Sequence, residues 1–231
     1  MSYIGTNKIG KMHLGNTAIG KAYLGNDLVY SSDGGIAPVL TYDAELDYLQ
    51  SSGTQYIETG IIPTNTTGIK IVFDLVEVRD AFIVGCRINA SNTRWSIGSS
   101  TSRYYGGYGT VYGGFPPYPS VGVLTECSLN YLNDGVFIVD NSAGHKETSL
   151  SALQFTPTHN IRLFGSAGIT GSYTVWSGKM YSVKISQNSG IVMDLIPVRV
   201  GQVGYMYDKV SGQLFGNNGT GSFILGNDKT T

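Results

Sequence analysis

The chain has 231 residues, of which only 13% are charged, and its formal net charge is −1. Ordinary globular domains carry about 25% charged residues, and this chain has no basic stripe, so we expect no binding to nucleic acid. No apolar run approaches the roughly 20 residues of a membrane helix, and the first residues lack the order of a secretory signal. The 32 glycines and 16 tyrosines favour an all-β protein with short strands.

The first thirty residues contain a repeat, in which IGKMHLGNTA (9–18) is followed at once by IGKAYLGNDL (19–28). Turn signals Gly5-Thr6-Asn7, Gly15-Asn16-Thr17 and Gly25-Asn26-Asp27 recur every ten residues. Glycine and asparagine tolerate the positive φ that tight hairpin turns require. The repeat therefore predicts a small β-meander with strands at 8–14 and 18–24; a quasi-solenoid built on the apolar-glycine pentapeptide is the alternative.

A sheet this thin cannot make its own core, so we expect the segment to gain stability by packing on another surface. We interpret residues 1–33 as an attachment segment, 34–37 as a linker and 38–231 as the main domain, because SSDGG at 31–35 is a flexible break. The candidate attachment residues are Ile4, Ile9, Met12, Leu14, Ile19, Tyr23 and Leu24.

The main domain contains many β-rich runs bounded by turn residues, and Asn133-Asp134-Gly135 is a strong hairpin signal. The expected strands are 56–59, 69–78, 82–88, 94–97, 126–132, 136–139, 161–164, 174–185, 191–200, 204–208 and 213–215. This number of short strands predicts an antiparallel two-sheet jelly-roll sandwich.

Three stretches resemble a known family. LDYLQSSGTQYIETGIIPT (46–64) resembles the first part of concanavalin A-like, laminin-G-type jelly rolls found in structural proteins of tailed phages and prophages of gut bacteria. SGKMYSVKISQNSGIVMDLIPVR (177–199) and GYMYDKVSGQLFGNNGTGSF (204–223) resemble the paired strands and the closing hairpin of the same fold. The resemblance implies a virion-associated protein of the head-fibre or tail-fibre type, made in the host cytoplasm. A fold alone assigns no ligand.

Residues 99–120, SSTSRYYGGYGTVYGGFPPYPS, combine tyrosine, glycine and serine as adaptable recognition loops do. Tyrosine offers an apolar face and a hydroxyl group, which suit a sugar or a protein partner. We therefore expect an adhesive loop that binds an external ligand. The alternative is a long Gly-Tyr hairpin that covers one end of the sandwich or packs against a sister subunit. The candidate carbohydrate- or partner-binding residues are Trp95, Arg103, Tyr104, Tyr105, Tyr108, Tyr112 and Tyr118.

Catalytic chemistry is not expected. Glycoside hydrolases need facing carboxylates, and the spacing Glu45-Leu46-Asp47 lacks the third acid of the Glu-x-Asp-x-x-Glu motif, because position 50 is Gln. We interpret Asp43, Glu45 and Asp47 as a solvated edge or loop.

Metal sites and cofactors are not expected either. His13, His145 and His159 are scattered and no Cys-x-x-Cys pair is present, so a zinc site is excluded by spacing. Asp134 and Asp208 were weighed as calcium ligands, and both are better explained as turn residues. Cys86 and Cys127 are interpreted as reduced, partly buried thiols, since a disulfide would need a proximity that the sequence does not show.

The sequence thus predicts a non-enzymatic structural protein on the surface of a phage particle. Residues 1–33 would attach it to a capsid or other virion protein, and the jelly roll would face outward as a head-fibre or capsid-decoration protein. By analogy with phage projections we expect a homotrimer. The alternatives are a tail-associated protein that recognises host surface glycans and a glycan-cleaving hydrolase.

Overall fold

A computed structural model of the chain describes residues 42–87, 93–109, 111–115, 119–151, 156–168 and 175–230, together with short strands within residues 2–31. For the strands within 2–31 and for 111–115, only the backbone is described. The chain divides into two compact units, Met1–Tyr42 and Asp43–Thr231. The predicted linker, 34–37, lies outside the described residues.

The first unit contains three antiparallel strand pairs, each a two-stranded sheet of its own. The pairs are β1 (Ser2–Ile4) with β2 (Asn7–Ile9), β3 (His13–Leu14) with β4 (Thr17–Ala18), and β5 (Lys21–Leu24) with β6 (Asp27–Ser31). The two strands of each pair are separated in the sequence by two residues, and each of these intervals belongs to one of the predicted turn signals. The strands are shorter than the seven residues expected, and isolated hairpins of this length are marginal in water.

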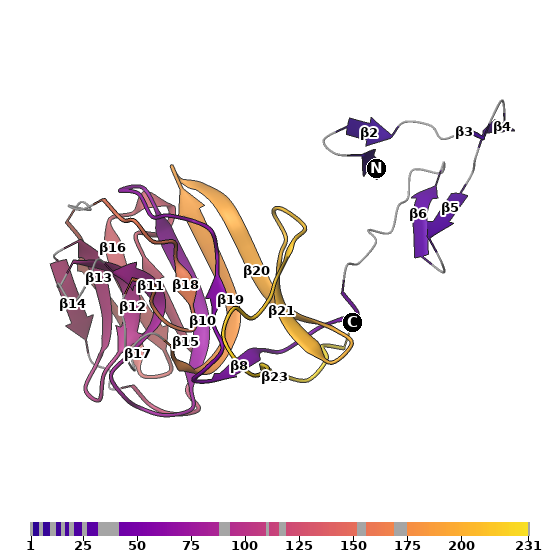
Figure 1. Cartoon of the computed structure of the whole chain (residues 1–231). Helices are drawn as coiled ribbons and strands as arrows, with labels where there is room; N and C mark the ends of the chain where they lie inside the picture. The colour runs from indigo at the N-terminus through magenta and orange to yellow at the C-terminus, as the bar shows by residue number, and fades with distance from the viewer. Residues whose placement is uncertain are drawn as a thin grey trace. The chain divides into compact units, whose positions relative to one another are not determined.

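The second unit is a sandwich of two antiparallel sheets (Figure 1). The larger sheet has the order β17-β16-β15-β10-β19-β20-β21-β22, with β7, β8 and β23 alongside, and the smaller has the order β14-β13-β12-β11-β18-β9. The strands of the larger sheet are β7 (Ala44–Glu45), β8 (Leu49–Ser52), β10 (Gly68–Leu75), β15 (Thr125–Leu129), β16 (Val136–Asn141), β17 (Gly144–Ser149), β19 (Ser177–Gln187), β20 (Gly190–Val200), β21 (Val203–Asp208), β22 (Leu214–Phe215) and β23 (Ile224–Leu225). Those of the smaller sheet are β9 (Ile57–Glu58), β11 (Ala81–Arg87), β12 (Arg94–Ser99), β13 (Tyr104–Gly109), β14 (Val111–Phe115) and β18 (Arg162–Leu163).

The predicted all-β, two-sheet jelly-roll architecture is confirmed by this arrangement. The part of the chain that the structure describes contains no α-helix, only the 3₁₀ turn η1 (Tyr131–Asn133). No helix there is long and apolar enough to cross a membrane.

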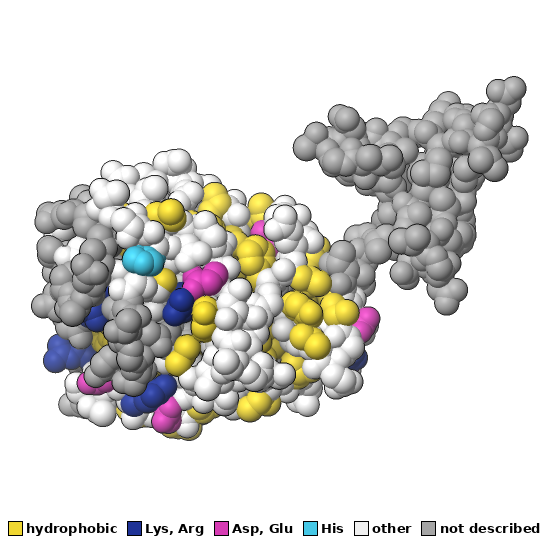
Figure 2. Space-filling model, viewed as in Figure 1, with side chains coloured by type: hydrophobic (Ala, Val, Ile, Leu, Met, Phe, Trp, Pro, Cys, Tyr) yellow, Lys and Arg dark blue, Asp and Glu magenta, His cyan; other side chains and the backbone are white. Residues whose placement is uncertain are grey.

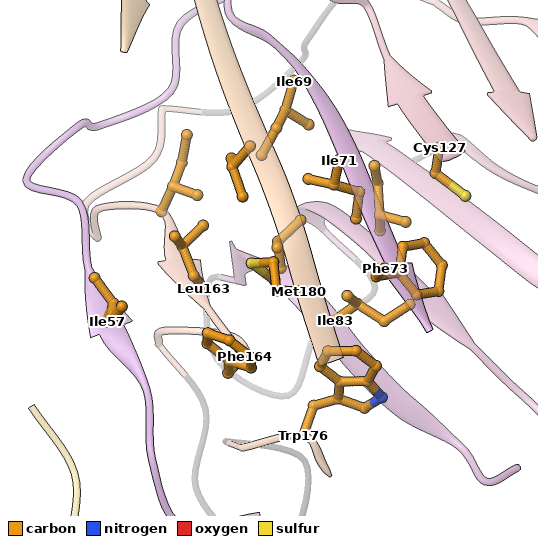
Figure 3. Packing of buried hydrophobic residues seen from close by; sticks show 14 of the residues in the cluster. Ile57, Ile69, Ile71, Phe73, Ile83, Cys127, Leu163, Phe164, Trp176 and Met180 are labelled. Carbon is orange, nitrogen blue, oxygen red and sulfur yellow. The ribbon is translucent and has the colours of Figure 1, made fainter. Parts of the chain in front are cut away.

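The core lies between the two sheets because strand residues alternate between faces. On β10, Ile69, Ile71 and Phe73 point inward and are fully buried. Phe73 meets the ring of Tyr104 from the opposite sheet edge-on at 5.7 Å and the ring of Trp176 at 5.9 Å. Figure 3 shows Phe73, Trp176 and Phe164 beside the aliphatic side chains of the same cluster.

The expectation of an adhesive loop is wrong where Tyr104–Gly109 forms β13 and Val111–Phe115 forms β14, an antiparallel pair in the smaller sheet that matches the Gly-Tyr hairpin alternative. Tyr104 and Tyr108 point into the core, and Gly106 lies between them on the same face. A Cβ atom at Gly106 would lie 2.6 Å from the ring of Phe137 on the larger sheet. Glycine is therefore present to let the two sheets approach, and the segment belongs to the core.

We predict that Gly106→Ala destabilises the sandwich by about 1–3 kcal/mol, because the added methyl group overpacks the site beside Phe137. Urea unfolding followed by tryptophan fluorescence would measure the change. Gly190→Ala is the matched control, since a Cβ there would meet only the Gln187 carbonyl oxygen at 3.6 Å. Equal stability of the two variants would contradict the packing role of Gly106.

Residues near the two ends of the second unit meet beside the C-terminal end of β20. We call this group of residues the terminal pole (Asp43, Arg199, Gly201 and Asp228). The Arg199 guanidinium donates from Nε and Nη2 to the two carboxylate oxygens of Asp228, at 2.7 and 2.6 Å. Asp43 Oδ2 accepts the Gly201 N–H at 2.6 Å and lies 3.8 Å from Arg199 Nη1. The hydrogen bond from Arg199 holds the pKa of Asp228 below its usual value. One side chain thus ties the first and last residues of the sandwich together.

We predict that Arg199→Ala loosens both chain ends while the rest of the sandwich stays folded. Amide exchange should accelerate about tenfold or more at Asp43 and Lys229, whose N–H groups donate to Arg199 and Glu45 carbonyls. Because the folded-state pKa of Asp228 is lowered, the tie is present above the usual aspartate pKa and is lost as pH falls through the lowered value. The difference in amide exchange rate between the wild type and Arg199→Ala should therefore become smaller at acidic pH.

Lys184→Ala, which removes a 3.6 Å ion pair with Asp194 in the middle of the sheet, is the control for Arg199→Ala. If amide exchange at Asp43 and Lys229 is unchanged in Arg199→Ala, the backbone hydrogen bonds alone hold the two chain ends, and the role of the guanidinium group is refuted.

Candidate functional site

Four of the predicted binding residues are interior side chains. Trp95 and Tyr104 are fully buried, and Tyr108 and Tyr105 are 2% and 5% exposed. Each tyrosine hydroxyl has a partner inside the protein: Tyr105 donates to the Ala81 carbonyl at 3.0 Å, and Tyr108 donates to that of Asn65 at 2.6 Å. Burial raises the pKa of Tyr104 and of Tyr108 to about 12. These four rings are therefore corrected to structural residues, since no external ligand can reach them.

The other three predicted binding residues lie apart. Arg103 is exposed in the turn between β12 and β13, where its N–H donates to Ser100 Oγ at 3.2 Å. Tyr112 belongs to β14, whose side chains are not described, and Tyr118 lies outside the described residues. The alternation Tyr104-x-Gly106-x-Tyr108 is the strand signal that the loop interpretation overlooked.

The attachment segment remains a prediction. Ile4, Ile9, Leu14, Tyr23 and Leu24 lie on strands of the first unit, with only the backbone described. Met12 and Ile19 lie outside the described residues.

The two aspartates considered as calcium ligands, Asp134 and Asp208, have structural partners. Asp208 is buried and accepts the N–H groups of Asp194, Val210 and Ser211 as well as the Ser211 hydroxyl. Asp134 Oδ1 accepts the Val136 N–H at 3.1 Å. The interpretation of both as turn residues is confirmed. Among the described residues, no group of three or more His, Cys, Asp or Glu side chains could hold a metal ion.

Cys86 and Cys127 are free thiols, as predicted, and both are buried. Burial raises the pKa of Cys86 to about 12, so the thiol stays protonated at neutral pH. These cysteines contribute to packing.

A surface site is formed where the larger sheet forks. One edge of β19 pairs with β8 through Ser177–Met180 and with β20 through Val183–Gln187. On the other edge, the register with β10 shifts between Met180 and Ser182, which leaves Tyr181 as the extra residue of a β-bulge. Because bulges redirect a side chain and recur beside functional sites, Tyr181 is the residue to inspect.

Around the fork, one row of side chains crosses four strands on the outer face. The strand registers align Ile224 of β23, Gln50 of β8, Lys179 of β19 and Asp74 of β10. The neighbouring row contains Leu49, Met180 and Phe73, which are buried in the core, so alternation places the first row on the outside. These residues are distant in sequence and meet only because of the strand order.

Tyr48 and Tyr181 complete this site, which we call the fork cluster (Tyr48, Gln50, Asp74, Lys179, Tyr181 and Ile224). The two tyrosine rings are half-buried, and their centroids lie 5.6 Å apart with a tilt of 60°. Lys179 Nζ lies 4.8 Å from the centroid of the Tyr48 ring and 3.9 Å from Asp74 Oδ2. Asp74 Oδ1 is buried and has no hydrogen-bond partner among the described residues.

The fork cluster combines apolar rings with hydrogen-bonding groups. Burial raises the pKa of Tyr181, and the charge of Asp74 and the neighbouring Tyr48 and Asp47 raise it further. The Tyr181 hydroxyl therefore stays protonated and able to donate at neutral pH. Gly226 closes the site from behind: its N–H donates to the Tyr48 carbonyl at 3.0 Å, and a Cβ would lie 2.8 Å from the Tyr48 nitrogen.

The opposite end of β20 from Arg199, which we call the far pole (Ile62, Leu132, Asn188, Ser189 and Ile191), is a second exposed surface. Leu132, Asn188 and Ser189 adopt positive φ. With Asn130 and Asn133 they make up five of the six non-glycine residues with positive φ in the described part of the chain. Ile62 is 50% exposed, Leu132 42% and Ile191 39%. Strained backbone and exposed apolar side chains thus coincide at the far pole.

Charged side chains are sparse on the visible face of the sandwich (Figure 2). Hydrophobic side chains are scattered among polar ones there and do not form one continuous patch. This surface fits contacts made by hydrogen bonds and single apolar groups.

No known protein family and no curated protein matches the sequence. Solved structures with a similar fold include a candidate carbohydrate-binding protein from Bacteroides ovatus, with a TM-score of 0.57 and 9% identity over 80% of this chain and 61% of that chain. This chain therefore spans about three-fifths of that protein. The shared feature is the fold, a two-sheet β-sandwich.

Weaker similarities include a pentraxin from Limulus polyphemus, with a TM-score of 0.46 and 12% identity over 79% of this chain and 93% of that chain. Tailspike protein 2 of an Escherichia coli O157:H7 bacteriophage has a TM-score of 0.38 and 12% identity over 65% of this chain and 27% of that chain.

We predict that Asp74→Asn lowers the pKa of Tyr181 towards the usual tyrosine value of 10.0, because it removes the nearby negative charge. Because the pKa of Tyr181 is higher in the folded state than in the unfolded chain, the wild type loses stability as pH rises above the tyrosine pKa of the unfolded chain. Asp74→Asn makes this pKa difference smaller, so the variant should lose less stability over the same pH range. NMR titration of ring-labelled tyrosine would measure the shift. Glu126→Gln, a change on β15, should leave the Tyr181 titration unaltered, and an equal shift in both variants would refute the local arrangement.

Proposed function

We propose that the protein is a non-enzymatic component of a phage particle, attached through its N-terminal unit and presenting the lectin-like sandwich outward. Within the particle we propose a head-fibre or capsid-decoration role and a homotrimeric assembly. The partner of the N-terminal unit is then a capsid or other virion protein, and the partners of the sandwich are sister subunits and host surface glycans.

The terminal pole is the observation that carries this proposal. Arg199 holds Asp43 and Asp228 together, so the sandwich is connected to its N-terminal unit at a single pole. β20 has eleven residues, so the far pole lies roughly 33 Å from that connection along the strand. We propose that partners other than the virion protein bind at the far pole or on the sheet faces of the sandwich.

The strand pairs of the first unit support an attachment role. Each is a separate two-stranded sheet with strands of two to five residues. Hairpins this short gain stability chiefly by packing or pairing with another surface, and a virion protein or sister subunit offers one.

Recognition of host glycans by a tail-associated protein is the second candidate, and the fork cluster favours it. Two half-exposed tyrosine rings beside a carboxylate and an ammonium group suit the mixed apolar and polar surface of a sugar. A hydrolase has less support, because the Asp43 carboxylate accepts a hydrogen bond from Gly201 at the terminal pole and the Asp208 carboxylate accepts hydrogen bonds from its own turn. β7 also ends at Glu45, so strand alternation does not extend to Asp47.

Removing residues 1–42 should leave a folded sandwich that no longer joins the particle. We expect incorporation to fall at least about tenfold, with an unchanged β-type circular dichroism spectrum and a cooperative thermal transition. Immunoblotting of purified particles would measure incorporation, and electron microscopy of labelled full-length protein would place it on capsid or tail. Full-length Lys184→Ala is the control. Normal incorporation of the truncated chain would overturn the attachment role.

A further inference from the structure

We propose that the fork cluster is a binding site for an uncharged saccharide. This inference deepens the glycan-recognition part of the proposed function, because it assigns the site and the class of sugar. It rests on four features of the described residues: the bulge, the two rings, the unpartnered carboxylate oxygen and the balance of charge.

The first feature is that the fold builds this site at a cost. A bulge interrupts the ladder between β10 and β19 at Tyr181, and the same position is where β19 changes partner from β8 to β20. A bulge changes the direction of the side chain that it carries, which a regular ladder would not do. Here the interruption brings Tyr181 beside Tyr48, which comes from a segment more than a hundred residues away.

The second feature is the shape of the apolar surface. The rings of Tyr48 and Tyr181 are inclined at 60°, so their exposed parts form an angled surface and not a flat stack. Ile224, at 48% exposure, lies in the adjacent outer row and extends that surface past Gln50. An angled apolar surface of two rings matches the C–H groups of a puckered pyranose better than a planar base or aromatic ligand.

The third feature is an acceptor that the protein does not use. Asp74 is 6% exposed and its Oδ1 has no hydrogen-bond partner among the described residues, which is costly for a buried carboxylate. Lys179 Nζ lies 3.9 Å from Asp74 Oδ2, beyond hydrogen-bond distance, so the lysine can shift without breaking a hydrogen bond to this residue. A sugar hydroxyl that enters beside Lys179 would donate to Asp74, and Gln50 offers both a donor and an acceptor.

The fourth feature is charge. Asp47 and Asp74 are two carboxylates close enough to act on the Tyr181 hydroxyl, and the ion pair that the described residues show for them is that of Lys179 with Asp74. Asp47 is half-buried and its side chain lies 3.5 Å from Asn227 Nδ2. A site with more negative than positive charge repels uronic acids, sialic acids and phosphates, while neutral hydroxyls act as donors to it. The favoured ligand is therefore a neutral hexose or N-acetylhexosamine.

The test uses the full-length protein, a glycan array of neutral and acidic oligosaccharides, and NMR titration with methyl glycosides. The neutral probes are the methyl glycosides of glucose, galactose, mannose and N-acetylglucosamine, and the charged probes are methyl glucuronide and N-acetylneuraminic acid. Titration to about 50 mM covers the millimolar range typical of weak single-sugar binding. We expect saturable shifts at Tyr48 and Tyr181 with at least one neutral probe and none with the charged probes.

Tyr48→Ala and Tyr181→Ala should each weaken binding at least about tenfold, and Tyr181→Phe should do so several-fold while keeping the ring. The matched control is Tyr131→Ala. Tyr131 is also half-buried, has Lys70 5.6 Å from its ring and lies near a carboxylate, since Lys70 pairs with Glu126 at 2.7 Å, but no second tyrosine ring among the described side chains packs against it. Binding by Tyr131→Ala should stay within about twofold of wild type.

Three outcomes would overturn the inference. If Tyr181→Phe and Tyr48→Ala bind as wild type does, the glycan lies elsewhere on the sandwich and only this site assignment fails. If the wild type prefers acidic probes, the charge argument is wrong. If the wild type binds no probe and no array glycan, glycan recognition fails as well, while attachment through residues 1–42 is judged separately by particle incorporation.

Discussion

The contact of aromatic rings between the two sheets is the interaction on which the sandwich depends. Phe73 of the larger sheet meets Tyr104 of the smaller one and Trp176 beside β19, and Phe164 stacks on Trp176 at 6.0 Å. These rings fix the spacing of the layers, and Gly106 adapts to that spacing by leaving room for Phe137. The outer face of β10 and β19, where the fork cluster lies, is held in place by this packing on the inner face.

The strand content of the sandwich could be predicted because strands such as β10 and β20 are rich in apolar, β-branched residues, which are visible in the sequence itself. β13 is absent from the expected strands because Gly106 interrupts the apolar alternation between Tyr104 and Tyr108, and because tyrosine and glycine are equally common on recognition loops. Burial, which separates the two interpretations for Tyr104 and Tyr108, depends on a second sheet that only the fold supplies.

The fork cluster could not have been predicted from the sequence. Its members come from β8, β10, β19, β23 and the residues just before β8, and their alignment follows from strand order and from a bulge. Local sequence specifies neither. Tyr48 and Asp74 also look ordinary in isolation, since a tyrosine next to Asp47 and an aspartate near the end of a strand match many surface positions. The turn roles of Asp134 and Asp208, by contrast, depend on adjacent residues and were read correctly.

The terminal pole also determines how the sandwich responds to tension. Asp43 hydrogen-bonds through its N–H to the carbonyl of Arg199, and its carboxylate accepts from Gly201, so a pull on the N-terminal side is transmitted directly to β20. β20 is one of the two longest strands and lies between β19 and β21. A pull at Asp43 therefore loads its bonds to Arg199 and Gly201 and the two residue pairs between β7 and β20 before it reaches the interior of the sheet. In the proposed attachment role, the strength of this short connection would set the load at which the N-terminal side of the sandwich begins to open.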